Sequence, residues 1–385
     1  MFRRWFAVLA TAGLVAMSCA AGSAPAATYD VSVDNKSSAF NFQATAYFPN
    51  ELKAHPGDTI RFTSIDRGEP HTVTFGTLVD AAVPKFQPGG PPVLDAFGLP
   101  DLIGGQPPAL VVSQAAAQPC FLASGAPPKS GACSKEQQTQ VAFDGTQVFV
   151  NSGYLADKQV FALKLADSIK AGTYNFLCLL HGAAGMTGKI AVVEKSQPTQ
   201  TADEVKTKAT DQLNQRVLAL QPNVDAAKSA TAASAFAGVF SEKAQDSQAM
   251  IMGPTQLTIP VGGSVTWKIF GPHTVSFNAP ADAVGVFAKA PDGNFGLNPK
   301  AVAPVGWPGP PPPPAGGPPP APNAPPQTIP VIAPAWDGKG FHSSGLLLSF
   351  PPNFFSYKLT FAQAGTYPFK CLIHPDMEGT VKVGQ

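Results

Sequence analysis

Apolar and polar residues alternate along many short segments of this chain, which is the pattern of strands with one buried face. The first such segments are residues 28–33 and 40–46. Glycine and proline separate further short segments as far as residue 193, an arrangement typical of a β-sandwich. The same alternation predicts closing strands at 189–193 and 380–383. We therefore expect an all-β fold.

One region has the period of a helix instead. Thr201 and Glu204 are spaced as a capping box, the reciprocal pairing that begins many helices. The pattern predicts a helix from about 201 to 220. Its alanine-rich continuation to about residue 239 fits either more helix or a linker, so this segment could hold two domains apart or pack against them. The apolar residues spaced three or four apart are Val205, Ala209, Leu213, Val217 and Leu220.

Four blocks of sequence occur twice, in the same order. A chance match of four ordered blocks is improbable, so we interpret the chain as two copies of one domain, each folding around its own core. We expect a signal peptide at 1–27, a first domain at 28–195, a partly helical linker at 196–247 and a second domain at 248–385. The paired blocks are 57–62 with 262–267, 70–75 with 272–277, 151–153 with 343–345, and 172–181 with 365–374.

The last block of each copy contains metal-ligating residue types. A cysteine is followed three positions later by a histidine and then by a methionine, and another histidine lies upstream. Soft sulfur with imidazole selects copper, and one cysteine with two histidines and a distant methionine is the blue-copper geometry. Zinc would accept the cysteine and the histidines but has little use for a thioether. The residues are His71, Cys178, His181 and Met186 in the first copy, and His273, Cys371, His374 and Met377 in the second.

With these motifs, the sequence resembles the cupredoxin, or small blue copper protein, family over most of both halves. Four residues between His181 and Met186 give a loop like that of plastocyanin, and two between His374 and Met377 a loop like that of amicyanin. The resemblance implies two tandem Greek-key β-sandwiches, each holding one type 1 copper ion with the residues named above. It also implies that both loop histidines lie near the surface as electron ports. A threonine follows each upstream histidine where many members have asparagine, which leaves open the hydrogen bond that steadies the cysteine loop.

The low content of charged residues argues against one class of function, nucleic-acid binding. The chain has 385 residues, 13% of them charged, and a net charge of +1. Nothing in it suggests nucleic-acid binding, which would call for a basic stripe.

A basic start at 1–4 and an apolar run at 5–17 are typical of a secretory signal, with a small-residue cleavage site at 24–26. Paired arginines also permit twin-arginine export. We expect a periplasmic or extracellular protein.

Three cysteines remain after two are assigned to metal. An oxidising compartment predicts a disulfide between Cys120 and Cys133. Closing this loop of about 14 residues would contribute on the order of 3 kcal/mol. Cys19 follows the apolar run and is either a lipid anchor that tethers the protein to a membrane or is removed with the signal.

Both copies have a long insertion between the upstream histidine and the Ser-Gly block. It spans about 80–147 in the first copy and 279–340 in the second. Residues 308–314 are almost all proline, which predicts a polyproline II segment. We favour solvated, mobile loops over docking arms for these insertions.

The sequence favours an electron carrier that meets redox partner proteins and is not an enzyme. A multicopper oxidase or a nitrite reductase would need further histidines, but of six only His55 and His342 remain. Copper storage or delivery would use the same ligands and stays an alternative. Asp376 and Glu378 flank the second methionine. Because negative charge stabilises Cu(II), we expect the second site to have the lower potential and to pass electrons to the first.

Overall fold

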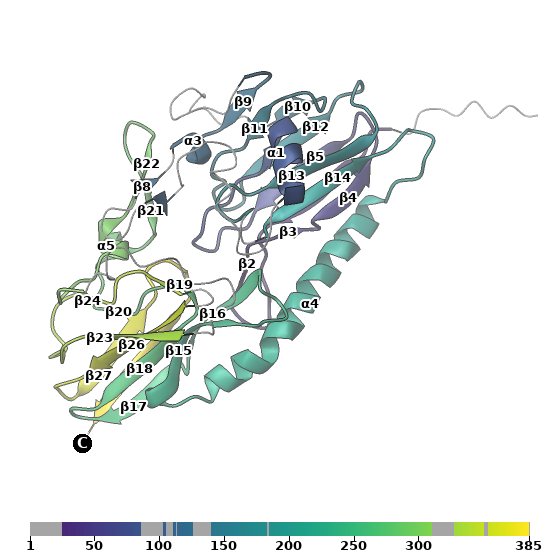
Figure 1. Ribbon diagram of the computed structural model, residues 1–385. Helices are drawn as coiled ribbons and strands as arrows, with labels where there is room; N and C mark the ends of the chain where they lie inside the picture. The colour runs from purple at the N-terminus through teal and green to yellow at the C-terminus, as the bar shows by residue number, and fades with distance from the viewer. Residues whose placement is uncertain are drawn as a thin grey trace, which may run out of the picture.

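The computed structural model describes residues 25–85, 103–104, 111–112, 114–125, 140–182, 185–309, 327–349 and 353–384. Their strands form two β-sandwiches, and one long helix, α4 (Ala202–Lys228), runs beside both (Figure 1). The predicted all-β fold is confirmed. None of the helices in these described ranges is both long and apolar enough to cross a bilayer.

The first sandwich has two sheets. One pairs strands in the order β10 (Gln140–Phe143), β12 (Val160–Leu165), β5 (Thr59–Ser64), β1 (Thr28–Val33) and β3 (Tyr47–Phe48). The other has the order β4 (Glu51–Ala54), β14 (Thr187–Val192), β13 (Gly172–Leu177), β6 (Thr74–Phe75), β11 (Phe149–Asn151) and β9 (Cys120–Leu122).

The second sandwich repeats this order of strands. One sheet is β2 (Phe42–Ala44), β16 (Ser247–Gly253), β15 (Ala235–Phe240), β18 (Ser264–Ile269), β26 (Asn353–Thr360) and β23 (Gln327–Ile332). The other is β17 (Gln256–Pro260), β28 (Glu378–Gly384), β27 (Gly365–Lys370), β20 (Ser276–Phe277) and β24 (His342–Ser343). β15 pairs in parallel with β18 as β1 does with β5, so the repeated sequence is also a repeated topology. β15 lies inside the segment 196–247 that was expected to be linker.

Aromatic rings fill both cores in matching positions, because alternate residues of a strand point to the same face. The ring centroids of Phe62 and Phe176 are 5.1 Å apart in the first sandwich. Those of Trp267 and Phe369, at the equivalent places in β18 and β27, are 5.3 Å apart in the second. The alternation seen in the sequence therefore reports real buried faces.

A strand of the first half completes a sheet of the second half. β2 lies between β1 and β3 in the chain, but it pairs with β16, with Ala44 opposite Ser247 and Phe42 opposite Ala249. The strand predicted at 40–46 thus forms in the other sandwich, and the two halves do not have wholly separate cores. The buried cluster at this junction contains Phe40, Phe42, Ala44, Ala46, Phe48, Leu220, Val224, Ala227, Val239 and Ala249.

Helix α4 confirms the helix predicted at 201–220 and continues beyond it. The hydroxyl of Thr201 accepts from the backbone N–H of Glu204, whose carboxylate accepts from the Thr201 N–H, so the capping box forms. Further along, Arg216 pairs with Asp246 at 2.6 Å, in the loop between β15 and β16. The helix is therefore a packed element that fixes the relation of the two sandwiches.

The described parts of the two insertions contact each other. Gln114 donates to the backbone oxygen of Phe295 at 2.7 Å and accepts from its N–H at 2.9 Å. The rings of Tyr154 and Phe295 are 5.0 Å apart. The expectation of solvated, mobile loops is wrong for these residues, because they bury surface between the halves. The elements of this region are α1 (Thr77–Ala82), α3 (Gln114–Ala117), α5 (Pro299–Val302) and the strand pairs β7 (Ile103–Gly104) with β8 (Val111–Val112) and β21 (Phe287–Lys289) with β22 (Phe295–Leu297). A further pair, β19 (Gly271–His273) with β25 (Leu347–Ser349), lies outside the insertions.

Some predictions fall on residues outside the described ranges. Residues 1–24, which contain Cys19 and all but the last three residues of the expected signal peptide, are among them, as are Cys133 and residues 310–314 of the proline-rich run. Cys120 is disulfide-bonded, in keeping with the predicted pair.

Candidate metal centres

The first cluster joins residues from two parts of the first sandwich. His71 lies between β5 and β6, whereas Cys178 and His181 lie in the turn after β13. The Nδ1 atom of His71 is 3.2 Å from that of His181, which is 3.6 Å from the Cys178 sulfur. The N–H of Gly182 donates to the backbone oxygen of Cys178 at 2.8 Å and closes the turn. Three predicted ligands therefore converge.

The second cluster has the same construction. His273 ends β19, and Cys371 and His374 lie in the turn after β27. The two Nδ1 atoms are 3.0 Å apart, and the Cys371 sulfur is 3.9 Å from His273 Nδ1 and 3.7 Å from His374 Nδ1. The repeat in sequence thus places the same three side chains together twice.

Both clusters fit one small metal ion. In each, the three ligand atoms lie within 4.8 Å of one another. Nitrogen and sulfur ligands lie about 2.0–2.3 Å from an ion such as zinc, so atoms spaced in this way can share one. Met186 and Met377 are 0% and 1% exposed, and their backbone oxygens accept from the cysteine N–H groups at 3.1 and 2.9 Å. The backbone keeps each methionine beside its cysteine, while coordination by the thioethers stays a prediction.

A threonine steadies each cysteine loop. The N–H of Thr72 donates to the Cys178 sulfur at 3.3 Å, and its hydroxyl accepts from the N–H of Leu179 at 2.8 Å. Thr274 makes the equivalent contacts in the second copy at 3.5 and 2.8 Å. The hydroxyl therefore supplies the hydrogen bond that the sequence left open.

The repeated Ser-Gly blocks brace the strand that follows each upstream histidine. The Ser152 hydroxyl accepts from the N–H of Val73 at 2.8 Å, and the Ser344 hydroxyl from that of Val275 at 2.9 Å. The glycine after each serine has a φ of 66° or 70°, which other residues rarely adopt. Each block therefore supports the backbone two residues after the upstream histidine of its cluster.

Electrostatics in both clusters favour the metal-binding form of cysteine. Burial alone would raise the pKa of both thiols, but the adjacent imidazoles hold it well below the usual range. Burial alone would lower the pKa of the rings, but thiolate and carboxylate neighbours raise it to about 10 for His71 and about 9 for His181 and His374. His273 differs, because burial lowers its pKa. The thiolate is the form that binds metals.

Asp34 contacts the outer side of one ligand in the first cluster. Its Oδ2 atom is 3.5 Å from His71 Nε2, and both side chains are fully buried. Its Oδ1 atom accepts from the N–H groups of Asn35 and Ala44, each at 2.6 Å. Burial raises the pKa of the Asp34 carboxyl, and His71 and these N–H groups oppose that rise. The carboxylate orients the ring so that Nδ1 faces the cluster.

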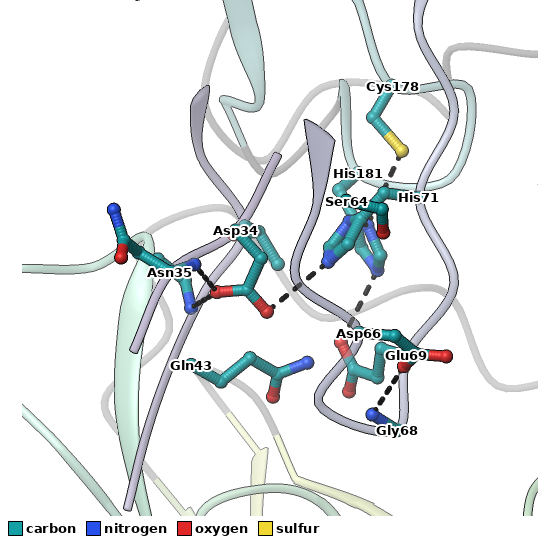
Figure 2. A network of polar contacts seen from close by, with 12 residues as sticks. Asp34, Asn35, Gln43, Ser64, Asp66, Gly68, Glu69, His71, Cys178 and His181 are labelled. Atoms are coloured by element: carbon teal, nitrogen blue, oxygen red, sulfur yellow. Dashed lines mark hydrogen bonds and ion pairs between the residues drawn. The ribbon is translucent and has the colours of Figure 1, made fainter. Parts of the chain in front are cut away.

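Glu69 contacts one histidine of each cluster. Its Oε2 atom is 3.5 Å from His181 Nε2, and its Oε1 atom is 3.4 Å from His374 Nε2. Burial alone would raise the pKa of the Glu69 carboxyl, but the two imidazoles hold it well below its usual range. Figure 2 shows Glu69 and Asp34 on the side of the rings away from the Cys178 sulfur. One carboxylate thus lies between the two clusters.

Sequence reasoning missed both carboxylates, although one signal was present. Nine positions separate Phe62 from His71, but only six separate Trp267 from His273 at the equivalent places. The longer first-copy segment contains Glu69. No comparable signal marks Asp34, which reaches the site only through the fold.

The expected surface position of both loop histidines is wrong for His374. This residue is 2% exposed, since the segment around Gly68 lies against its backbone. The His181 side chain retains 16% exposure. Of the two loop histidines, His181 is therefore the one that solvent can reach.

The remaining two histidines lie apart from both clusters. His55 Nε2 is 2.8 Å from the backbone oxygen of Gln197, and His342 Nε2 is 2.7 Å from the Tyr357 hydroxyl. Burial lowers the pKa of His342 to about 4. Within the described ranges, no third group of histidine, cysteine and carboxylate side chains converges as these two do.

No protein-family model and no curated protein matches this chain. Among solved structures, it is similar to a reduced auracyanin from Roseiflexus castenholzii, with 15% identity and a TM-score of 0.22 over 43% of this chain and 96% of that one. An amicyanin variant in its Cu(I) form is 13% identical, with a TM-score of 0.20 over 43% of this chain and 82% of that one. A plastocyanin variant of fern is 15% identical, with a TM-score of 0.20 over 43% of this chain and 99% of that one. Similarity at this level is too low to establish a relationship, and the β-sandwich architecture follows from the strand order alone.

Proposed function

We propose that this chain is an exported electron-transfer protein with two tandem cupredoxin domains and two mononuclear type 1 copper sites. The observation that carries the proposal is the pair of equivalent clusters, each with one cysteine and two histidines. When bound, copper supplies one-electron exchange between Cu(II) and Cu(I). The ligands would be His71, Cys178, His181 and Met186 in one site, and His273, Cys371, His374 and Met377 in the other.

The surrounding residues suit a site whose ligands stay in place when the ion changes charge. A backbone N–H donates to each cysteine sulfur, and such hydrogen bonds tune the potential of a blue-copper site. Carboxylates orient three of the four imidazoles from behind. Because the rings and thiolates already converge, little rearrangement is needed to bind or to change the charge of the ion.

Burial favours a retained ion over an exchangeable one. His273, Cys371 and His374 are 0%, 3% and 2% exposed. Storage or delivery of copper would require ligands that a receiving molecule can reach, and these are covered. Electron exchange needs only a short distance to the surface, and we place it at the partly exposed edge of His181, where partner redox proteins would dock.

The experiment is metal analysis with a visible spectrum of the oxidised protein. We expect two coppers per chain and an intense band from the Cu(II)–thiolate bond. The variants Cys178→Ser and Cys371→Ser should each lose one copper band and keep the other, which makes each the control for its partner. Two bound coppers without the band would favour storage, and zinc in both sites would refute the proposal.

Export is a separate part of the proposal. It rests on the basic start and apolar run of residues 1–17. An intact mass of the protein recovered outside the cytoplasm would distinguish cleavage after the 24–26 segment from a chain that begins at a lipidated Cys19. Recovery of the full-length chain in the cytoplasm alone would refute export.

A further inference from the structure

We propose that Glu69 joins the two metal centres into one electron-transfer unit by contacting a ligand histidine of each. This inference rests on the proposed function and adds the relation between its two sites. It makes Glu69 a positioning residue for both centres, acting through His181 and His374.

The contacts are matched on the two sides. The two carboxylate oxygens lie 3.5 Å from His181 Nε2 and 3.4 Å from His374 Nε2. The Nδ1 atoms of these rings face their own clusters, so each ring has its metal-binding edge on one side and Glu69 on the other. The Glu69 side chain is 12% exposed, which limits screening by water.

Residues from both halves hold this segment in position. Gly68, with a φ of 105°, lies so close to Ile373 that an added Cβ would be 2.2 Å from the Ile373 backbone oxygen. Next to it, Arg67 is 3.6 Å from Asp376 in the second metal loop and also donates to Asn41. The segment that contains Glu69 is therefore docked on the second metal loop.

The carboxylate is supplied once, by an extension that only the first copy has. The equivalent segment of the second copy runs directly from Ile269 through 270–272 to His273 and contains no acidic residue. If Glu69 served only its own domain, contact with His181 would suffice. Its second oxygen instead contacts the other centre, so the extension relates the two sites.

This arrangement has two consequences. With copper bound at both sites, His181, Glu69 and His374 would form a chain of side chains between the two ions and would provide a route for one-electron exchange between them. The negative charge of Glu69 would also stabilise Cu(II), the more positive state of the ion. It would act on both centres, because the carboxylate is nearly equidistant from the two rings. Removing this charge should therefore raise both reduction potentials.

The test uses Glu69→Gln in two backgrounds, Cys178→Ser and Cys371→Ser, each with one working site. We expect the midpoint potential to shift upward in both backgrounds. Asp34→Asn is the matched control, since it removes a buried carboxylate that contacts a histidine of the first cluster alone, His71, and it should shift the first site alone. A Glu69→Gln shift confined to one site, or absent from both, would overturn the inference.

A second measurement needs no change at Glu69. Pulsed EPR of Cu(II) in each single-site protein reads the environment of the imidazole nitrogen that does not bind the metal. We expect His181 and His374 to give matching signals, since both face the same carboxylate. A signal of contact with water at His374, which is 2% exposed, would overturn the inference even if Glu69→Gln failed to fold. Absence of the copper–thiolate bands from the unsubstituted protein would instead refute the proposed function. Failure of the proposed function can therefore be distinguished from failure of the Glu69 inference.

Discussion

At the scale of single residues, the candidate ligands could be recognised in the sequence, but the groups that support them could not. Cysteine, histidine and methionine are rare and were spaced in a repeated pattern, so His71 and Cys371 stood out in the sequence. Asp34 and Glu69 are ordinary acidic residues whose roles depend on which rings the fold brings within 3.5 Å. The threonine after each upstream histidine was visible, but its function became clear only from its hydrogen bonds.

One prediction at this scale concerns the Thr72 hydroxyl. Thr72→Val keeps the shape but removes the acceptor of the Leu179 N–H, which is buried. An unpaired buried N–H costs about 1–3 kcal/mol, so chemical unfolding of the metal-free protein should show a loss of that size. Thr72→Ser keeps the hydroxyl and should lose less. The Cu(II)–thiolate band of the first site should shift while that of the second stays unchanged; an unaltered first band and unaltered stability would contradict this role.

At the scale of elements, the helix between the repeats was predicted well at its start and poorly at its end. The capping box at Thr201 is a local signal and forms as expected. The last turns are alanine-rich and contain Pro222, and the sequence left helix and linker both open there. They are stabilised instead by packing, since Val224 and Ala227 are fully buried in the junction cluster, which also contains residues of β2, β15 and β16. Tertiary contacts thus decided where the helix ends.

A prediction for this element follows from its cap. Thr201→Ala removes the hydroxyl that accepts from the Glu204 N–H and should lower the free energy of unfolding by about 1 kcal/mol. Thr210→Ala is the matched control, because that exposed hydroxyl bonds only the Lys206 backbone oxygen within the helix. Urea unfolding should show a loss for the first variant and none for the second. Equal effects would mean that the cap does not stabilise the folded chain.

At the scale of the whole molecule, the repeat predicted two like sandwiches but concealed how they are joined. The repeat itself suggests independent units, because each copy contains a complete set of ligands. The contacts between them come from parts that differ between the copies: the excursion that forms β2, the longer segment before His71, and the insertions at Gln114 and Phe295. Non-repeated segments therefore determine how the repeated ones are arranged.

The positions of the acidic residues in the folded chain change which of the two sites is expected to have the lower reduction potential. The acidic residues near Met377 suggested a lower potential at the second site, but Asp376 is 79% exposed and lies 3.6 Å from Arg67. Water and the arginine both weaken its effect on a distant ion. Asp34, by contrast, is fully buried beside His71, and no carboxylate takes that place at His273 among the described residues. Glu69 is common to both sites and cannot distinguish them.

We therefore predict that the first site has the lower potential and that, at equilibrium, electrons move from it to the second. A buried carboxylate stabilises Cu(II) more than exposed ones do, because little water screens it. Redox titration of Cys371→Ser and Cys178→Ser, which report the first and the second site, should show this order. Asp34→Asn in the Cys371→Ser background should raise the potential of the first site toward that of the second, whereas Glu378→Gln in the Cys178→Ser background should change the second little. A higher potential at the first site, unaffected by Asp34→Asn, would show that hydrogen bonds to the cysteine sulfurs, and not buried charge, set the order.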